Sequence, residues 1–165
     1  MNAEFEELYQ QVILDHSKRP RNYGLLEEPA IHVDGDNPSC GDEIHLHVRF
    51  GNEGQVEEIK FTGSGCAISQ ASASLMTLKL KGKSRSEAKD LLEAFTEVVT
   101  RGELEAPRAL GDLRLLGGVR KFPQRVKCAM LAWRAFEQSL QSQTGAPPVV
   151  STEDGTQADA QEKAP

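Results

Sequence analysis

The chain has 165 residues, 38% of them hydrophobic, and a formal net charge of −6. This length suits one domain with a buried core, and the charge argues against a nucleic-acid-binding protein. No stretch is apolar over the roughly 18 residues that a membrane-spanning helix needs, and the acidic start MNAEFEELYQ lacks the basic and apolar regions of a signal peptide. We therefore expect a cytoplasmic protein whose three cysteines serve packing, redox chemistry or metal binding rather than disulfides.

The first part of the chain predicts one helix and a small sheet. Apolar residues at helical spacing predict an amphipathic helix over residues 4–16, which ends before Pro20 and Gly24. Alternating or apolar stretches predict three strands, over 31–34, 44–50 and 55–62. The last two strands flank the turn at 51–54, which indicates an antiparallel hairpin with one face in water.

The remainder of the chain predicts helices. Apolar stripes indicate helices over about 68–78, 85–99 and 124–141. Ser84 and Glu87 have the spacing of a capping box before the second of these. Residues 101–123 are rich in Gly, Pro and Arg and predict a long ordered loop, a kind of segment that is usually functional or mobile.

The order of these elements predicts an α+β fold, with a small antiparallel sheet of about three strands and helices packed on one of its faces. We assign residues 1–142 to this domain. From residue 143 onward the composition changes to Gly, Pro, Ser, Thr, Gln, Ala and acids, which predicts a disordered acidic tail over 143–165.

Each cysteine lies where a thiolate is easily formed or presented. Cys40 lies in a turn sequence, Asn37-Pro38-Ser39-Cys40-Gly41-Asp42. Cys66 opens a predicted helix, whose N-terminal dipole favours the thiolate, and Cys128 lies in the first turn or two of the last helix. Three thiolates and Asp42 would complete the four ligands of a tetrahedral zinc site. The carboxylate would be the weakest ligand for a thiophilic metal and could leave.

The residue pattern alone leaves other interpretations open. A single cysteine is most often a small buried apolar residue, the chain has no CxxC pair, and an aspartate after a glycine is ordinarily a turn residue. His45 and His47 on the polar face of a strand could bind metal, although a solvated face explains them as well. His16 and His32 are expected to be surface or capping groups.

Basic residues surround the third cysteine. No acid occurs between Leu113 and Arg134, and the basic residues there are Arg114, Arg120, Lys121, Arg125, Lys127 and Arg134. Arg125 precedes Cys128 by three residues, so the two side chains are neighbours on a helix. The run is either a solvated basic face or a functional surface beside the thiol.

These residues resemble the SufU-type members of the IscU/NifU-like iron–sulfur cluster assembly family over about residues 5–141. The shared markers are Leu14-Asp15-His16, Pro20-Arg21-Asn22, Asn37-Pro38-Ser39-Cys40-Gly41-Asp42, Gly63-Ser64-Gly65-Cys66-Ala67-Ile68-Ser69, Ala71-Ser72, Arg125-Val126-Lys127-Cys128 and Trp133. The resemblance implies a SufE/NifU-like α+β fold with the three cysteines at one end. It also implies a metal site formed by Cys40, Asp42, Cys66 and Cys128.

Two departures from the family pattern point to one subgroup. Lys127 stands where IscU-type scaffolds have a histidine, and residues 113–123 form an additional segment, as in SufU-type proteins. The resemblance then implies a Zn²⁺-dependent sulfurtransferase that accepts persulfide sulfur from a PLP-dependent cysteine desulfurase (SufS-type) and supplies downstream Suf scaffold proteins. We expect Cys40, on its mobile turn, to accept the sulfur and Arg125 to assist it.

Two other functions are consistent with the same residues. The first is a scaffold on which iron and sulfide form a [2Fe–2S] cluster on the same ligands. The second is a structural zinc domain that only docks on a partner.

Overall fold

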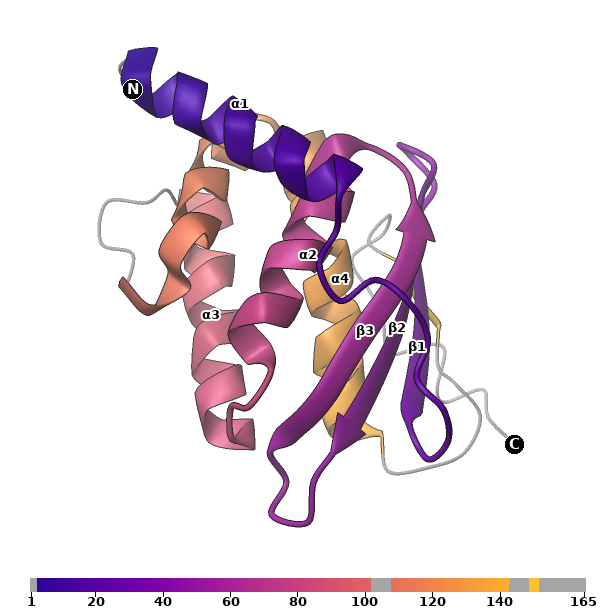
Figure 1. Ribbon diagram of the computed structural model, residues 1–165. Coiled ribbons are helices and arrows are strands. Elements are labelled where there is room, and N and C mark those ends of the chain that lie inside the picture. The colour runs from indigo at the N-terminus through magenta and orange to yellow at the C-terminus, as the bar shows by residue number, and fades with distance from the viewer. Residues whose placement is uncertain (1–2, 102–107, 143–148, 152–165) are drawn as a thin grey trace.

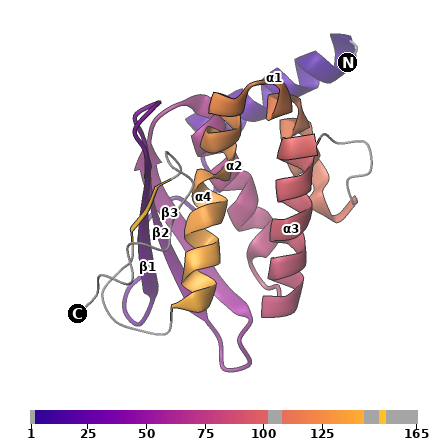
Figure 2. The same cartoon turned by 180° about the vertical axis from the view of Figure 1, so that it is seen from behind.

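The computed structural model describes residues 3–101, 108–142 and 149–151. Its elements in chain order are α1 (Ala3–Lys18), β1 (Ile31–Asn37), β2 (Asp42–Phe50), β3 (Val56–Ser64), α2 (Ala67–Leu80), α3 (Arg85–Arg101), the 3₁₀ segment η1 (Arg108–Lys121), α4 (Pro123–Gln141) and β4 (Val149–Ser151). The helices gather on one side of an open sheet (Figures 1 and 2). The predicted α+β class is therefore confirmed.

The sheet has the strand order β3-β2-β1-β4. The predicted strands β1, β2 and β3 pair antiparallel, and the short β4 pairs parallel with β1. β1 continues to Asn37, beyond the predicted end at residue 34, and Asn37 pairs with Asp42 at the start of β2. The longer β1–β2 pairing leaves only a tight turn, which contains Cys40, between the two strands.

The two faces of the sheet differ as the alternation predicts. Ile44, Leu46 and Val48 of β2 are fully buried, while His45 and His47 between them are only partly covered. α2 and α4 pack on the buried face, and α3 and η1 pack behind these two helices (Figures 1 and 2). None of the described helices therefore packs on the histidine-bearing face of the sheet.

The core between the helices is built around Trp133 of α4. Its ring stacks on Phe95 of α3 at a centroid distance of 4.6 Å. Its indole Nε1–H donates to Ser72 Oγ of α2 at 3.2 Å, so the one polar group of the ring has a partner. The stack and the hydrogen bond join α2, α3 and α4 below the cysteines.

The prediction of a loop over residues 101–123 is wrong in its described part. Residue 101 ends α3, and residues 108–121 form η1, in which buried apolar residues recur every third position: Leu110, Leu113, Leu116 and Val119. That interval matches the three residues per turn of a 3₁₀ helix. Gly111, with φ 56° and ψ −131°, interrupts the segment. Packing of the leucines on the core outweighs the helix-breaking composition.

Two further predictions concern the capping box before α3 and the C-terminal tail. The capping box predicted before α3 is present, since Ser84 N donates to Glu87 Oε1 and Glu87 N to Ser84 Oγ. The predicted tail over 143–165 falls mostly outside the described residues and stays a prediction there, although residues 149–151 form β4. None of the described helices is long and apolar enough to cross a membrane.

Candidate metal centre

Three separate elements bring the cysteines to one end of the molecule. Cys40 lies in the β1–β2 turn, Cys66 caps the N-terminus of α2, and Cys128 lies in the second turn of α4. The starts of α2 and α4 lie at the same end of the molecule in both views (Figures 1 and 2). Cys128 Sγ is 3.4 Å from Cys40 Sγ, which joins residues that are 88 positions apart.

The predicted fourth ligand, Asp42, lies among the three thiols. The ligand atoms of Cys40, Asp42 and Cys128 all lie within 4.8 Å of one another. Cys66 reaches the group through Asp42, whose Oδ2 is 3.8 Å from Cys66 Sγ. The donor set is three sulfurs and one carboxylate oxygen, which suits a thiophilic divalent metal such as zinc.

Asp42 is held in place by the backbone amide of Cys66, and the absence of a side chain at position 65 leaves room for it. Its carboxylate is buried, and Oδ1 accepts a hydrogen bond from Cys66 N at 2.8 Å. Gly65 has φ +138°, and a Cβ there would lie 2.3 Å from Asp42 Oδ1. The glycine before Cys66 is therefore needed both for its backbone conformation and for the space that Asp42 occupies.

Asn37 is a site residue whose role the sequence analysis missed. Its side chain is fully buried, and Nδ2 lies 3.3 Å from Asp42 Oδ2 and 3.6 Å from Cys128 Sγ. Its Oδ1 has no hydrogen-bond partner among the described residues. The sequence signal for this role is the position of Asn37 in the same turn motif as Cys40.

The pKa values of two of the thiols, Cys66 and Cys128, are shifted in opposite directions. Hydrogen bonds from Cys128 and from Ser69 N lower the pKa of Cys66 to about 6, so Cys66 is largely thiolate at neutral pH. The pKa of Cys128 is raised, chiefly because its thiol donates to Cys66 and because it is buried. Without metal, Cys128 keeps its proton and stabilises its neighbour.

Arg125 faces this group from solvent. Its side chain is exposed, and its interaction with Cys128, together with the charge of Cys66, raises the pKa of the guanidinium. The structure thus places the predicted assisting residue beside the thiols. Arg114, Arg120 and Lys121 of the basic run are also exposed, and a function for that run stays a prediction.

A groove of about 740 Å³ lies next to the site. Its walls come from α1, α2, the end of η1 and the start of α4, and include Tyr9, Ile68, Phe122, Pro123 and Arg125. The Phe122 side chain is 58% exposed. An apolar surface therefore borders the thiols on the side of Arg125.

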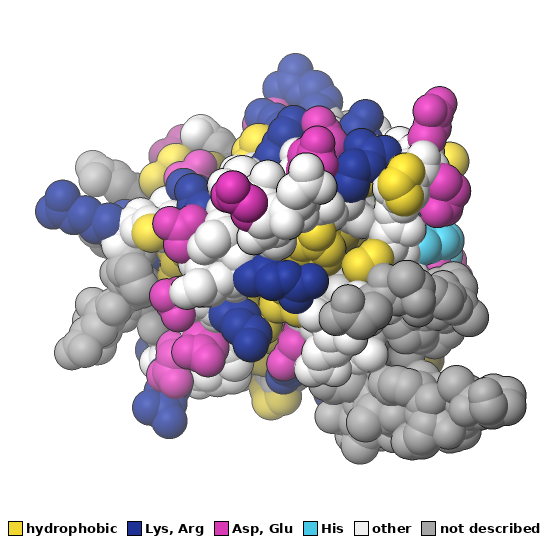
Figure 3. All heavy atoms as spheres, turned by 90° about the horizontal axis from the view of Figure 1, so that it is seen from below, with side chains coloured by type: hydrophobic (Ala, Val, Ile, Leu, Met, Phe, Trp, Pro, Cys, Tyr) yellow, Lys and Arg dark blue, Asp and Glu magenta, His cyan; other side chains and the backbone are white. Residues whose placement is uncertain are grey.

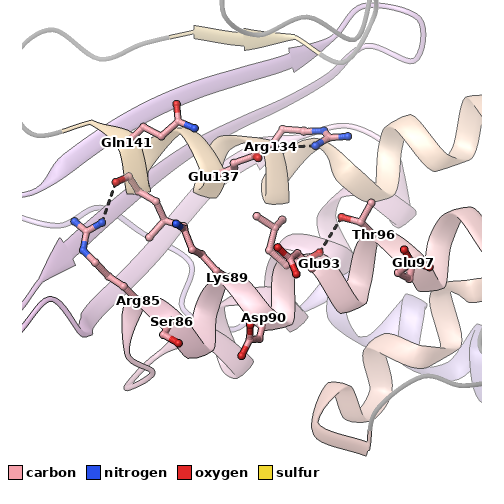
Figure 4. A pocket seen from close by; sticks show the side chains of 12 residues that line it. Arg85, Ser86, Lys89, Asp90, Glu93, Thr96, Glu97, Arg134, Glu137 and Gln141 are labelled. Carbon is pink, nitrogen blue, oxygen red and sulfur yellow. Dashed lines mark hydrogen bonds and ion pairs between the residues drawn. The ribbon is translucent and has the colours of Figure 1, made fainter.

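A second hollow, of about 830 Å³, lies between α3 and α4 (Figure 4). Several of its side chains are already engaged: Arg134 pairs with Glu137 at 3.3 Å, and Arg85 Nη1 donates to Leu140 O at 2.9 Å. The face seen from below likewise intersperses basic and acidic side chains rather than gathering one sign (Figure 3). No cysteine or histidine lines this hollow, so it offers no comparable chemistry.

The histidines divide into two groups. His16, expected at the surface or at a helix cap, is instead buried, and its Nδ1 lies 2.7 Å from Ser74 Oγ. This hydrogen bond joins α1 to α2, which indicates a structural role for His16. His32, His45 and His47 lie on the outer face of the sheet, away from the cysteines.

Comparison with known proteins identifies a family with this arrangement. Residues 8–142 match the family model of the NifU-like N-terminal domain. The chain is 44% identical over 144 residues to the zinc-dependent sulfurtransferase SufU of Bacillus subtilis, with 87% of this chain and 97% of that protein covered. It is equally 44% identical over 144 residues to the iron–sulfur cluster assembly scaffold protein IscU of Streptococcus pyogenes, with 87% and 89% covered.

Solved structures agree with these sequence relationships. A putative iron–sulfur cluster assembly scaffold protein for the SUF system from Fervidobacterium islandicum superposes with a TM-score of 0.72 at 34% identity. The match covers 79% of this chain and 94% of that one. The same domain is therefore present over almost the whole length of these relatives.

Proposed function

The chain belongs to the family of NifU-like N-terminal domains, and from that membership we propose that it is a zinc-dependent sulfurtransferase of iron–sulfur cluster assembly. Its sulfur donor would be the persulfide of a PLP-dependent cysteine desulfurase of the SufS type, and its recipients downstream Suf scaffold proteins in the cytoplasm. The observation that carries the proposal is the convergence of Cys40, Cys66 and Cys128 on the buried carboxylate of Asp42.

Cys40, Asp42, Cys66 and Cys128 would hold the zinc ion. When bound, zinc keeps thiols deprotonated near neutral pH. Asn37 supports this assignment, because an amide that donates to both a carboxylate and a sulfur orients two ligands at once. Lys127 also supports it, since a lysine stands where the IscU-type scaffolds that the chain resembles have a histidine, and an ammonium group does not bind zinc.

Cys40 is the proposed sulfur acceptor. It lies on the turn between two strands and is partly exposed, whereas Cys128 is buried in α4. Cys66 accepts a hydrogen bond from Ser69 N at the start of α2, so its thiolate is better suited to remain bound to the metal than to dissociate from it. Asp42, as the oxygen ligand, would move with Cys40 when the acceptor thiolate is released.

The transfer step is a thiol–disulfide type of exchange. The Cys40 thiolate attacks the outer sulfur of the desulfurase persulfide and forms a new S–S bond. The S–S bond of the donor breaks, and its electron pair leaves with the desulfurase thiolate. Arg125 would stabilise the Cys40 thiolate before attack, and the groove that includes Tyr9 and Phe122 would be the adjoining surface for the desulfurase; the electrostatic interaction of Arg125 with the thiols supports this role.

A sulfur-transfer assay with mass spectrometry tests the acceptor. After reaction with the desulfurase and cysteine, we expect one extra sulfur on the Cys40 peptide of the wild type. The Cys40→Ala variant should lose both transfer and desulfurase stimulation. If Cys40→Ala retains zinc and still transfers sulfur at the wild-type rate, the assignment of Cys40 is wrong.

The alternative function is a scaffold for a [2Fe–2S] cluster. The observation that favours it is the 44% identity to a relative named a scaffold protein, equal to the identity to the named sulfurtransferase. Anaerobic reconstitution with iron and sulfide distinguishes the two functions. A stable cluster, passed to an apo-protein faster than the zinc-loaded chain delivers sulfur, would favour the scaffold.

A further inference from the structure

A second group of metal-binding side chains lies on the outer face of the sheet. His32 and Asp34 belong to β1, and His45 and His47 belong to β2. The register pairs Asp34 with His45 and His32 with His47, so the four side chains are cross-strand neighbours on one face. No helix of the described residues packs on this face (Figures 1 and 2).

Two imidazole rings converge on a single carboxylate oxygen. Asp34 Oδ1 lies 2.7 Å from His45 Nδ1 and 2.9 Å from His32 Nε2. One ligand atom from each of His32, Asp34 and His45 lies within 4.8 Å of the other two. Three donors of nitrogen and oxygen type therefore lie close enough together to bind one ion.

The ring nitrogens are incompletely satisfied. The His32 Nε2 atom is close to Asp34, but its geometry does not make a hydrogen bond, and it is buried. Nε2 of His47 is also buried without a partner among the described residues. Buried polar atoms without partners are costly, which favours a ligand that these nitrogens bind directly.

Stacking also fixes the orientation of two of the rings. His32 and His47 stack with a centroid distance of 4.4 Å and an interplanar angle of 18°. The side chains of His32, Asp34 and His45 are between 38% and 40% exposed, so solvent reaches the group although His32 Nε2 itself is covered.

We propose that His32, Asp34 and His45 form a second metal site, which binds a divalent transition-metal ion through nitrogen and oxygen ligands. His47 is its positioning residue, since its ring packs on His32. Imidazole and carboxylate donors suit Zn²⁺, Ni²⁺, Co²⁺ or Cu²⁺, and the thiolates of the cysteine site also bind Zn²⁺. The two sites therefore differ in their donor atoms, which are nitrogen and oxygen on the sheet and mainly sulfur at the cysteines.

The two sites share one hairpin but are separate. Two residues of each strand lie between the Asp34–His45 pair and the Asn37–Asp42 pair, so the pairs are three steps apart, which is about 10 Å at the rise of a β-strand. The histidine ligands lie on the outer face, while Asn37 and Asp42 are buried on the inner side. Metal content measured on the whole chain would thus combine both sites.

Cobalt substitution separates them, because thiolate ligands give Co²⁺ intense charge-transfer absorption and nitrogen or oxygen ligands do not. With Co²⁺ as the probe, we expect about two ions per wild-type chain in equilibrium dialysis, only one of which contributes the thiolate band. The double substitution His32→Gln and His45→Gln should remove the ion without that band and leave the band unchanged. Asp34→Asn should weaken the same ion about 10-fold to 100-fold.

Asp36→Asn is the matched control, since Asp36 lies on the same face of β1 but outside the ligand group, and it should bind as the wild type does. Paramagnetic broadening by Co²⁺ of the His32 and His45 ring signals tests the wild type itself, independently of how the variants fold. Binding of a single Co²⁺ by the wild type, or retention of the second ion by the double variant, overturns the proposal.

Discussion

Residue 65 is a glycine, and the carboxylate of Asp42 occupies the space in which a side chain at this position would lie. The carboxylate of Asp42 then reaches Cys66 N and stands between the thiols. Asn37 completes the arrangement from the other side with hydrogen bonds to Asp42 and Cys128. At the scale of single residues, the site therefore depends on groups that are not ligands themselves.

Replacing Gly65 with alanine tests this dependence. The new Cβ would lie 2.3 Å from Asp42 Oδ1 and would force the carboxylate away from the thiols. We expect Gly65→Ala to lose about 1–3 kcal/mol of unfolding free energy. It should also bind zinc more weakly, by about 10-fold or more, measured by chelator competition.

Gly82→Ala is the control for backbone strain. Gly82 also has positive φ, +86°, but a Cβ there meets nothing within 4 Å. This variant should lose about 1–2 kcal/mol from the left-handed backbone alone and keep the zinc affinity of the wild type. Equal zinc affinity of the two variants would contradict a specific role for Gly65.

Among the elements, the β1–β2 hairpin and η1 show where packing extends or overrides a local pattern. The two strands of the hairpin pair over more residues than the sequence pattern predicts. Their pairing continues to Asn37 and Asp42, and this sets the position of Cys40 in the turn. In η1, leucines at every third position pack on the core although Gly and Arg are frequent. The capping box before α3 depends on short-range contacts alone and was predicted in full.

Ser84→Ala should destabilise α3 without affecting the metal centre. The substitution removes the acceptor for Glu87 N and should cost about 1 kcal/mol of unfolding free energy, measured by urea denaturation. Ser86→Ala, an exposed serine in the first turn of the same helix, should change stability by less than about 0.5 kcal/mol. A similar loss in both variants would argue against the cap.

For the whole molecule, the metal site connects elements that are distant in sequence. Its ligands come from the β1–β2 turn, the start of α2 and the start of α4. A metal bound to all three stabilises only the folded state, because the unfolded chain does not hold the ligands together. The centre is thus expected to contribute to stability as well as to sulfur transfer.

Removal of the metal should therefore lower the melting temperature. At a free zinc concentration about 1,000 times the dissociation constant, binding adds about 4 kcal/mol, which corresponds to a shift of about 10 °C for a domain of this size. We expect this shift on adding a chelator to the zinc-loaded wild type in a calorimetric scan. The same chelator should have little effect on Cys66→Ser, and an equal shift there would place the stabilising metal elsewhere.

Much of this protein follows from local sequence patterns. The alternation of β2 predicted both its buried and its histidine-bearing faces, and the turn around Cys40 and the helix start at Cys66 indicated where the thiols lie. These features depend on the backbone period and on neighbours a few residues apart, which a sequence displays directly. Even η1 carried its three-residue period in the spacing of Leu110, Leu113 and Leu116.

Only the tertiary structure decided which groups meet. The contact between Cys40 and Cys128 joins positions 88 residues apart, and the clash that excludes a side chain at Gly65 involves a different strand. The amide of Asn37 and the convergence of His32 and His45 on Asp34 likewise require the strand register. Such contacts arise from packing between elements. The order of residues along the chain therefore indicates which side chains can bind metal but not which other side chains they contact.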